Sequence, residues 1–342
     1  MTAAVAPTPQ ERGWVVPILA LVAFLLLPVA APWFAAVLPV RATYVFLLPA
    51  LAACMLVGWW RGGRLAPAIL WTVLTVWLLY RAEPRLSAYD FLVWGWGITL
   101  AAVFGVVSIL DARRPFFARA LLAATLTLVL GGGMALAKLR PSRLEKVLAS
   151  QDDRYIAGSM VMPRLFEQRF PDGMRRALAA VSRKELGTLD ALEQGSRNLA
   201  ARSKVVLPAM LLLESLAALA LAWTLYHRLH RARLGPALGP LREFRFNDQL
   251  VWGLIVGLTI ALLPTLAAYR GLGANLLLFF SALYALRGIG VLAWFAAPGG
   301  PVTSLLLGLL TFIFPVLTVA LGVGDIWFDW RRRVRPTPGT PQ

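Results

Sequence analysis

The chain has 342 residues, of which 59% are hydrophobic and only 15% are charged, and its mean hydropathy is +0.69. Soluble domains contain about 45–50% apolar and about 25% charged residues, so this composition excludes an ordinary soluble protein and predicts an integral membrane protein. The 34 Lys and Arg residues outnumber the 17 Asp and Glu residues, for a formal net charge of +17. Such an excess is typical of loops that face anionic lipid. We expect no nucleic-acid partner, because no basic run is interleaved with base-stacking aromatic residues.

Residue types suited to catalysis or metal binding are scarce. Cys54 is the single cysteine, which excludes an intramolecular disulfide and a Cys-based zinc or iron–sulfur site. His227 and His230 share a helical face but lack a third ligand, so we interpret them as a solvated interfacial turn. Nucleotide-binding, serine-hydrolase and zinc-peptidase motifs are absent from the sequence. We therefore expect no enzymatic activity, no metal and no cofactor.

Nine hydrophobic stretches are long enough, or nearly so, to cross a bilayer. A hydrocarbon core about 30 Å thick needs roughly 20 apolar residues in a helix, because unsatisfied backbone groups cannot face lipid. We predict an all-α, polytopic transmembrane helix bundle of about nine spans. The stretches are residues 14–38, 43–60, 65–80, 91–110, 116–137, 205–226, 250–268, 272–297 and 302–323.

Glycines within these stretches predict where helices pack closely or break. Gly253 and Gly257 form a Gly-x-x-x-Gly pattern that allows two helix backbones to approach. The stretch 272–297 is interrupted by Arg287-Gly288-Ile289-Gly290. We expect this helix to be the broken one.

A polar segment divides the hydrophobic stretches into two groups. Residues 138–204 hold 14 of the 34 basic and 8 of the 17 acidic residues. From Met174 onward, leucines and valines recur at spacings of three, four or seven, which predicts an amphipathic helical insertion. It is either a hairpin that rests on the bundle or a surface that docks a partner. The predicted units are an N-terminal bundle (1–137), the insertion (138–204), a C-terminal bundle (205–330) and a basic, Pro-rich tail (331–342).

Basic residues near the ends of the spans conflict over topology. Residues 227–246 and the tail after residue 330 are both rich in arginine, which favours the cytoplasmic side for each. Three predicted spans separate them, so they are expected on opposite sides. The earlier arginine-rich loops agree with residues 227–246, which would place the N-terminus inside and the insertion outside.

Two charged residues lie deep within hydrophobic stretches rather than at their ends. Glu214 is almost central in 205–226, and Arg287 is near the middle of 272–297. A lone charge at mid-membrane costs roughly 2.5–3.5 kcal/mol, so such residues turn toward protein, water or a partner. We expect the two to form an ion pair, which either fixes the packing of two helices or lines a pocket for an anionic or zwitterionic molecule. Asn275 and Tyr284 are further candidates for that pocket.

The end of the last stretch combines glycines, tryptophans and charges. We expect Gly322 and Gly324 to end the helix at the interface and Trp327 and Trp330 to anchor it there. Asp325, Asp329 and Arg331 are expected to form ion pairs in the headgroup zone.

This ending, with residues 244–246, 275–277 and 287–289, resembles the YybS-like family of bacterial multi-pass membrane proteins, a group of unknown function. The resemblance covers about residues 240–335. Pro49 in the second stretch, followed by Gly58 and the turn 61–64, is similar to substrate-binding subunits of energy-coupling-factor vitamin importers. These resemblances imply a bacterial inner-membrane protein that binds or transports a small molecule and needs an energising membrane partner. The alternative is a non-transporting scaffold that docks partner proteins through residues 138–204.

Overall fold

The computed structural model describes residues 14–30, 42–82, 88–138, 205–230, 233–296 and 313–333, together with residues 38, 40, 308 and 311. Every regular element in these ranges is helical, so the structure confirms an all-α membrane helix bundle. Most of the predicted insertion (138–204) and of the predicted tail (331–342) lies outside the described residues, namely residues 139–204 and 334–342.

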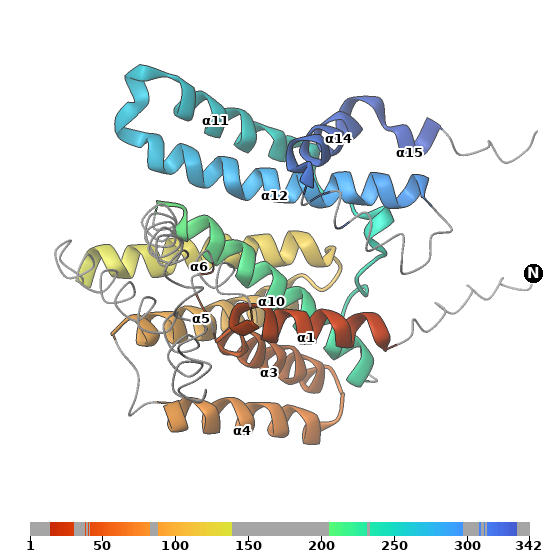
Figure 1. The fold of residues 1–342 in the computed structure, drawn as a ribbon. Helices are drawn as coiled ribbons and strands as arrows, with labels where there is room; N and C mark the ends of the chain where they lie inside the picture. The colour runs from red at the N-terminus through yellow and green to blue at the C-terminus, as the bar shows by residue number, and fades with distance from the viewer. Residues whose placement is uncertain are drawn as a thin grey trace, which may run out of the picture.

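The helices form two layers that are connected by residues 230–250 (Figure 1). The N-terminal layer comes from the first six helices of the described chain, and the C-terminal layer packs against it through α10 and α12. The first layer contains α1 (Val15–Ala30), α3 (Tyr44–Trp60), α4 (Leu65–Ala82), α5 (Ala88–Leu110), α6 (Phe116–Lys138) and α10 (Leu207–Leu229). The second contains α11 (Val251–Leu262), α12 (Arg270–Phe295), α14 (Pro315–Phe328) and α15 (Trp330–Arg333), preceded by the short 3₁₀ helices η2 (Leu241–Glu243) and η3 (Asp248–Leu250).

The N-terminal layer is held together by an apolar core in which α3 contacts α4, α5 and α10. Phe104 of α5, Phe116 of α6 and Trp223 of α10 are buried, with ring centroids 5.8–5.9 Å apart. The rings of Phe104 and Phe116, and of Phe104 and Trp223, meet edge to face, which is a preferred geometry for aromatic pairs. This core joins three helices that are far apart in the sequence.

Four described helices are long and apolar enough to cross a membrane: Tyr89–Leu110, Phe116–Met134, Leu207–Leu229 and Pro264–Phe295. Five more apolar helices are shorter, including α3, α4, α11 and α14. The nine hydrophobic stretches therefore contain nine apolar helices in the described chain, but only four have the full length of a span.

The predicted helix break is in a different place. α12 continues through Arg287-Gly288-Ile289-Gly290, so the expected interruption there is wrong. The interruption lies one helix earlier, where α11 ends and Leu263 is extended before Pro264 (φ −75°, ψ 121°). Proline disfavours a helical conformation at the residue before it, and here it starts the 3₁₀ helix η4 (Pro264–Tyr269).

α11 and α12 form a hairpin whose close approach depends on glycine. A Cβ on Gly257 would lie 2.9 Å from the Leu277 nitrogen, and one on Gly253 would clash with the Phe280 ring. The predicted Gly-x-x-x-Gly contact is therefore a helix-packing contact within the C-terminal layer.

Candidate functional site

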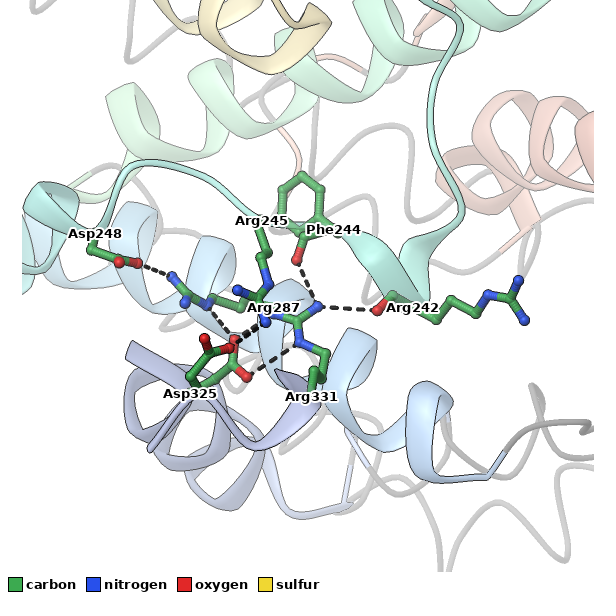
Figure 2. Close-up of polar contacts among 8 residues, drawn as sticks. Arg242, Phe244, Arg245, Asp248, Arg287, Asp325 and Arg331 are labelled. Atoms are coloured by element: carbon green, nitrogen blue, oxygen red, sulfur yellow. Dashed lines mark hydrogen bonds and ion pairs between the residues drawn. The ribbon is translucent and has the colours of Figure 1, made fainter. Parts of the chain in front are cut away.

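Arg287 of α12 is the centre of a buried network of charges in the C-terminal layer (Figure 2). Its side chain is 2% exposed. Nε donates to Asp325 of α14 at 2.9 Å, and Nη1 donates to Asp248 of η3 at 2.6 Å. The guanidinium also lies 5.5 Å from the ring centroid of Phe246. Arg287 is thus neutralised by two carboxylates from different segments.

Asp325 is shared by a second arginine (Figure 2). Nε of Arg331 donates to the Asp325 carboxylate at 3.2 Å, and Nη2 makes an ion pair with the same group. Nη1 of Arg331 donates to the backbone carbonyls of Arg242 and Phe244, at 3.0 and 3.1 Å. The buried carboxylate is thereby satisfied by two guanidiniums, as a buried charge requires.

These bonds join two basic segments that are far apart in the sequence. Arg331 follows α14 and Arg242 precedes α11, yet the two residues are in hydrogen-bond contact. Arg245 and Asp329 make a second link between the same segments, with Nη2 and Oδ1 2.5 Å apart. The two basic segments therefore lie beside each other in the structure, because α11 is short and α14 crosses α12 instead of continuing a series of straight spans (Figure 1).

Two glycines allow α12 and α14 to touch backbone to backbone. A Cβ on Gly288 would lie 1.9 Å from the Thr318 carbonyl oxygen, and a Cβ on Gly322 would lie 1.9 Å from the Tyr284 carbonyl oxygen. This contact places Arg287 against Asp325. Gly322 and Gly324 do not end the helix as expected, since α14 continues to Phe328 and is terminated by Asp329 in a left-handed conformation (φ 40°).

Asp325 was expected to form an ion pair in the lipid headgroup zone, but it is buried in the protein. It is 1% exposed, whereas Trp327 on the same helix is 64% exposed. The expected pair of Asp325 with Arg331 is present, but it lies inside the protein. Trp327 is the part of this segment that faces outward.

The predicted ion pair between Glu214 and Arg287 does not form. Arg287 pairs with Asp248 and Asp325, and no side chain among the described residues pairs with the carboxyl group of Glu214. Leu212 and Leu216 of α10 pack in the cluster that contains Phe279 and Leu283 of α12. At roughly 100° per residue, Glu214 lies on the other side of α10, toward the N-terminal layer.

Tyr284 lies beside the network without joining it. It is fully buried, its ring centroid is 5.0 Å from that of Phe246, and its hydroxyl has no partner in the described chain. Of the four residues predicted for a pocket, the structure therefore brings Arg287 and Tyr284 together on one face of α12 and leaves Glu214 apart from them.

Asn275 connects the start of α10 to the start of α12. Its Oδ1 accepts from the Ala209 amide at 2.9 Å, and its Nδ2 donates to the Val205 and Gly271 carbonyls at 2.5 and 2.7 Å. The amide of Ala209 is in the first turn of α10, where backbone donors lack helical partners. Asn275 thus acts as a clamp that links the two layers. Its amide group bonds to backbone groups rather than lining the predicted pocket.

Replacing Asn275 by Leu is expected to lower the free energy of unfolding by about 1–3 kcal/mol, because the backbone amide of the buried Ala209 loses its acceptor. The measurement is thermal unfolding of the purified protein in detergent. The control is Asn247→Leu, because Asn247 is exposed and its side chain bonds, among the described residues, to neighbouring Gln249. Equal effects of the two substitutions would contradict the clamp.

Sequence reasoning missed three polar groups of the N-terminal layer. His227 and His230 are 7% and 3% exposed, so their interpretation as a solvated turn is wrong. Residues 233–236 cover this end of α10: the Leu234 amide donates to the Tyr226 hydroxyl, and Trp223 Nε1 donates to the Pro236 carbonyl. Arg119, which follows a loop in the sequence, is also fully buried.

The sequence gives no local signal that Asp248 pairs with Arg287. Asp248 lies before α11 in a polar segment and is 58% exposed, so nothing in its neighbourhood marks it as the partner of a buried arginine.

A family described as "Predicted membrane protein (DUF2232)" matches residues 158–326. The chain is an integral membrane protein. The family match supports this conclusion, as do the four apolar helices of spanning length. The matched range includes Glu214, Arg287 and Asp325 and ends before Arg331. Comparison with curated proteins and with solved structures gives no significant match.

Proposed function

We propose that this chain is a multi-pass protein of the bacterial inner membrane that binds a small molecule as a component of a transport system. The observation that supports this proposal is Glu214. It is 4% exposed and near the middle of an apolar helix of spanning length, and no side chain among the described residues pairs with its carboxyl group. An acidic residue in this position is expensive, and such residues commonly serve a site for a substrate or an ion.

The surroundings of Glu214 favour a ligand that carries a cationic group. Its carboxyl group lies near the Val40 backbone, and Ala218, one turn further along α10, packs in a cluster with Phe46 and Trp94. Ser215, the next residue, accepts a hydrogen bond from Trp96 Nε1 at 2.9 Å. A carboxylate among aromatic rings suits an ammonium group, which both can stabilise. Arg287 is not proposed as a ligand residue, because two carboxylates already pair with it.

In this proposal the chain is of the YybS-like type, and its role resembles that of the substrate-specific subunits of energy-coupled importers. The sequence contains no nucleotide-binding motif. A transport role would therefore need a separate membrane partner that supplies energy. A scaffold that docks partners through residues 138–204 is the alternative outcome of the test below.

Glu214→Gln is expected to abolish ligand-dependent stabilisation of the protein. The experiment screens purified wild type against a panel of amines, amino acids and cationic vitamins by thermal unfolding. A ligand at 100 times its Kd stabilises a protein by about 2.7 kcal/mol, which is readily measured. Without ligand, Glu214→Gln should be as stable as wild type or more stable, because the substitution replaces a buried acidic group by a neutral amide of nearly the same shape.

The control is Asn275→Leu. This substitution weakens the contact between α12 and the start of α10, and it should keep the ligand-dependent shift. A shift that survives in Glu214→Gln would exclude this residue from the site. If no cationic compound stabilises wild type, and a membrane partner co-purifies only when residues 138–204 are present, the scaffold is supported instead.

A further inference from the structure

Besides Glu214, the N-terminal layer contains a set of buried polar groups near the C-terminal end of α10. Arg119 of α6 is 0% exposed, and its guanidinium carbon lies 4.4 Å from the centroid of the Trp223 ring. Its three side-chain nitrogens have no hydrogen-bond partner within the described chain. A cation–π contact alone leaves all five N–H donors of a buried arginine without acceptors.

Two histidines adjoin this arginine through the same aromatic residues. The ring centroid of His227 is 4.7 Å from that of Trp223, and the rings of His227 and His230 are 5.3 and 5.6 Å from that of Tyr226. No side chain that the structure describes bonds to a ring nitrogen of either histidine. Arg119 and His227 contact the same Trp223 ring, so these groups form one cluster.

Residues 233–236 close over the cluster. Gly235 has a positive φ of 70°, and a Cβ there would lie 2.9 Å from Nη2 of Arg119. The guanidinium edge therefore lies directly under this segment. The Leu234 amide and the Tyr226 hydroxyl, 3.0 Å apart, lie at the same place.

The charge around the cluster is positive. Arg233 acts on His227 together with Arg119. The acidic side chain that acts on Arg119 is Asp111, whose carboxylate is 39% exposed and pairs with Arg114 at 2.5 Å. Arg119 thus has no carboxylate of its own in the described chain, in contrast to Arg287.

We infer that Arg119, His227 and His230 form a binding site for a phosphate group beneath residues 233–236. Arginine binds phosphate through two parallel N–H···O bonds, and an anion here supplies the acceptors that the buried guanidinium lacks. The histidine N–H groups are further donors to the same anion. This site lies at the end of α10, four turns of helix from Glu214, so it is independent of the proposed function.

The experiment measures the thermal unfolding midpoint of the full-length protein in detergent, with two phosphate sources. One arm adds inorganic phosphate against chloride at equal ionic strength, and the other adds phosphatidylglycerol against an uncharged glycolipid. At least one source is expected to raise the midpoint by about 5 °C at saturation. Arg119→Met should lose this shift, whereas Arg113→Met, which changes an exposed arginine in the loop before α6, should keep it.

The result identifies the source of the phosphate group. A shift with phosphatidylglycerol alone supports a lipid headgroup, and a shift with inorganic phosphate supports a soluble ligand. No shift with either source, or an equal shift in wild type and Arg119→Met, would overturn the inference. If Arg119→Met does not fold, Arg119→Lys replaces it: lysine keeps the charge but not the two-pronged contact, so the shift should fall by at least half, and a full shift contradicts the site.

Discussion

Asp325→Asn is expected to lower the free energy of unfolding by about 3–5 kcal/mol. The substitution preserves side-chain shape but removes the charge that neutralises Arg287 and Arg331. Arg287 then retains only the half-exposed Asp248, and Arg331 retains only backbone carbonyls. Removing one partner from a buried ion pair is costly because the other charge stays buried. Thermal or denaturant unfolding in detergent measures the loss.

A matched control comes from the same end of α14. Asp329 pairs with Arg245, but both side chains are about one-third exposed. Asp329→Asn should therefore cost less than about 1 kcal/mol, as exposed pairs do. A loss as large as that of Asp325→Asn would mean that burial does not determine the importance of these charges.

A double-mutant cycle of Arg287→Met and Asp325→Asn tests the contact itself. The two residues touch, so the double variant should lose less stability than the sum of the single variants, by about 1–3 kcal/mol. Additive losses would show that Arg287 and Asp325 stabilise the protein separately. The same cycle with Glu214→Gln in place of Asp325→Asn should show no coupling.

Gly288→Ala is expected to destabilise the protein by about 3 kcal/mol or more, because its Cβ would lie 1.9 Å from the Thr318 carbonyl oxygen. The obstacle is backbone, which cannot rotate away as a flexible side chain can. α12 and α14 must therefore separate, and Arg287, one residue earlier, moves away from Asp325. Besides a lower unfolding midpoint, the coupling between Arg287 and Asp325 should shrink in this background.

The control is Gly95→Ala in α5, where a Cβ would have no described atom within 4 Å. Alanine is favoured over glycine within a helix, so stability should stay the same or rise by up to about 1 kcal/mol. If Gly288→Ala behaves like Gly95→Ala, the backbone contact between α12 and α14 is not as close as the structure indicates.

The hydropathy of the sequence predicted the helices, because a segment in lipid must satisfy its backbone hydrogen bonds internally and a helix does so. The stretch 116–137 corresponds to α6, and 205–226 to α10, with ends that differ by only a few residues. The sequence also contained the signal for the broken helix. Pro264 marks it through the restriction on the preceding residue, whereas the glycines after Arg287 are tolerated within α12.

The amino-acid sequence by itself determined that Glu214 and Arg287 are embedded in apolar helices, because position in a hydrophobic stretch is a local property. It did not determine their partners. Arg287 pairs with residues 38 and 39 positions away, and this choice depends on the crossing of α12 and α14 at Gly288 and Gly322. The tertiary structure also decided which face of α10 meets α12, leaving Glu214 on the opposite side. A buried charge is neutralised by whichever group the packed helices bring to it, and only the packing of distant segments specifies that group.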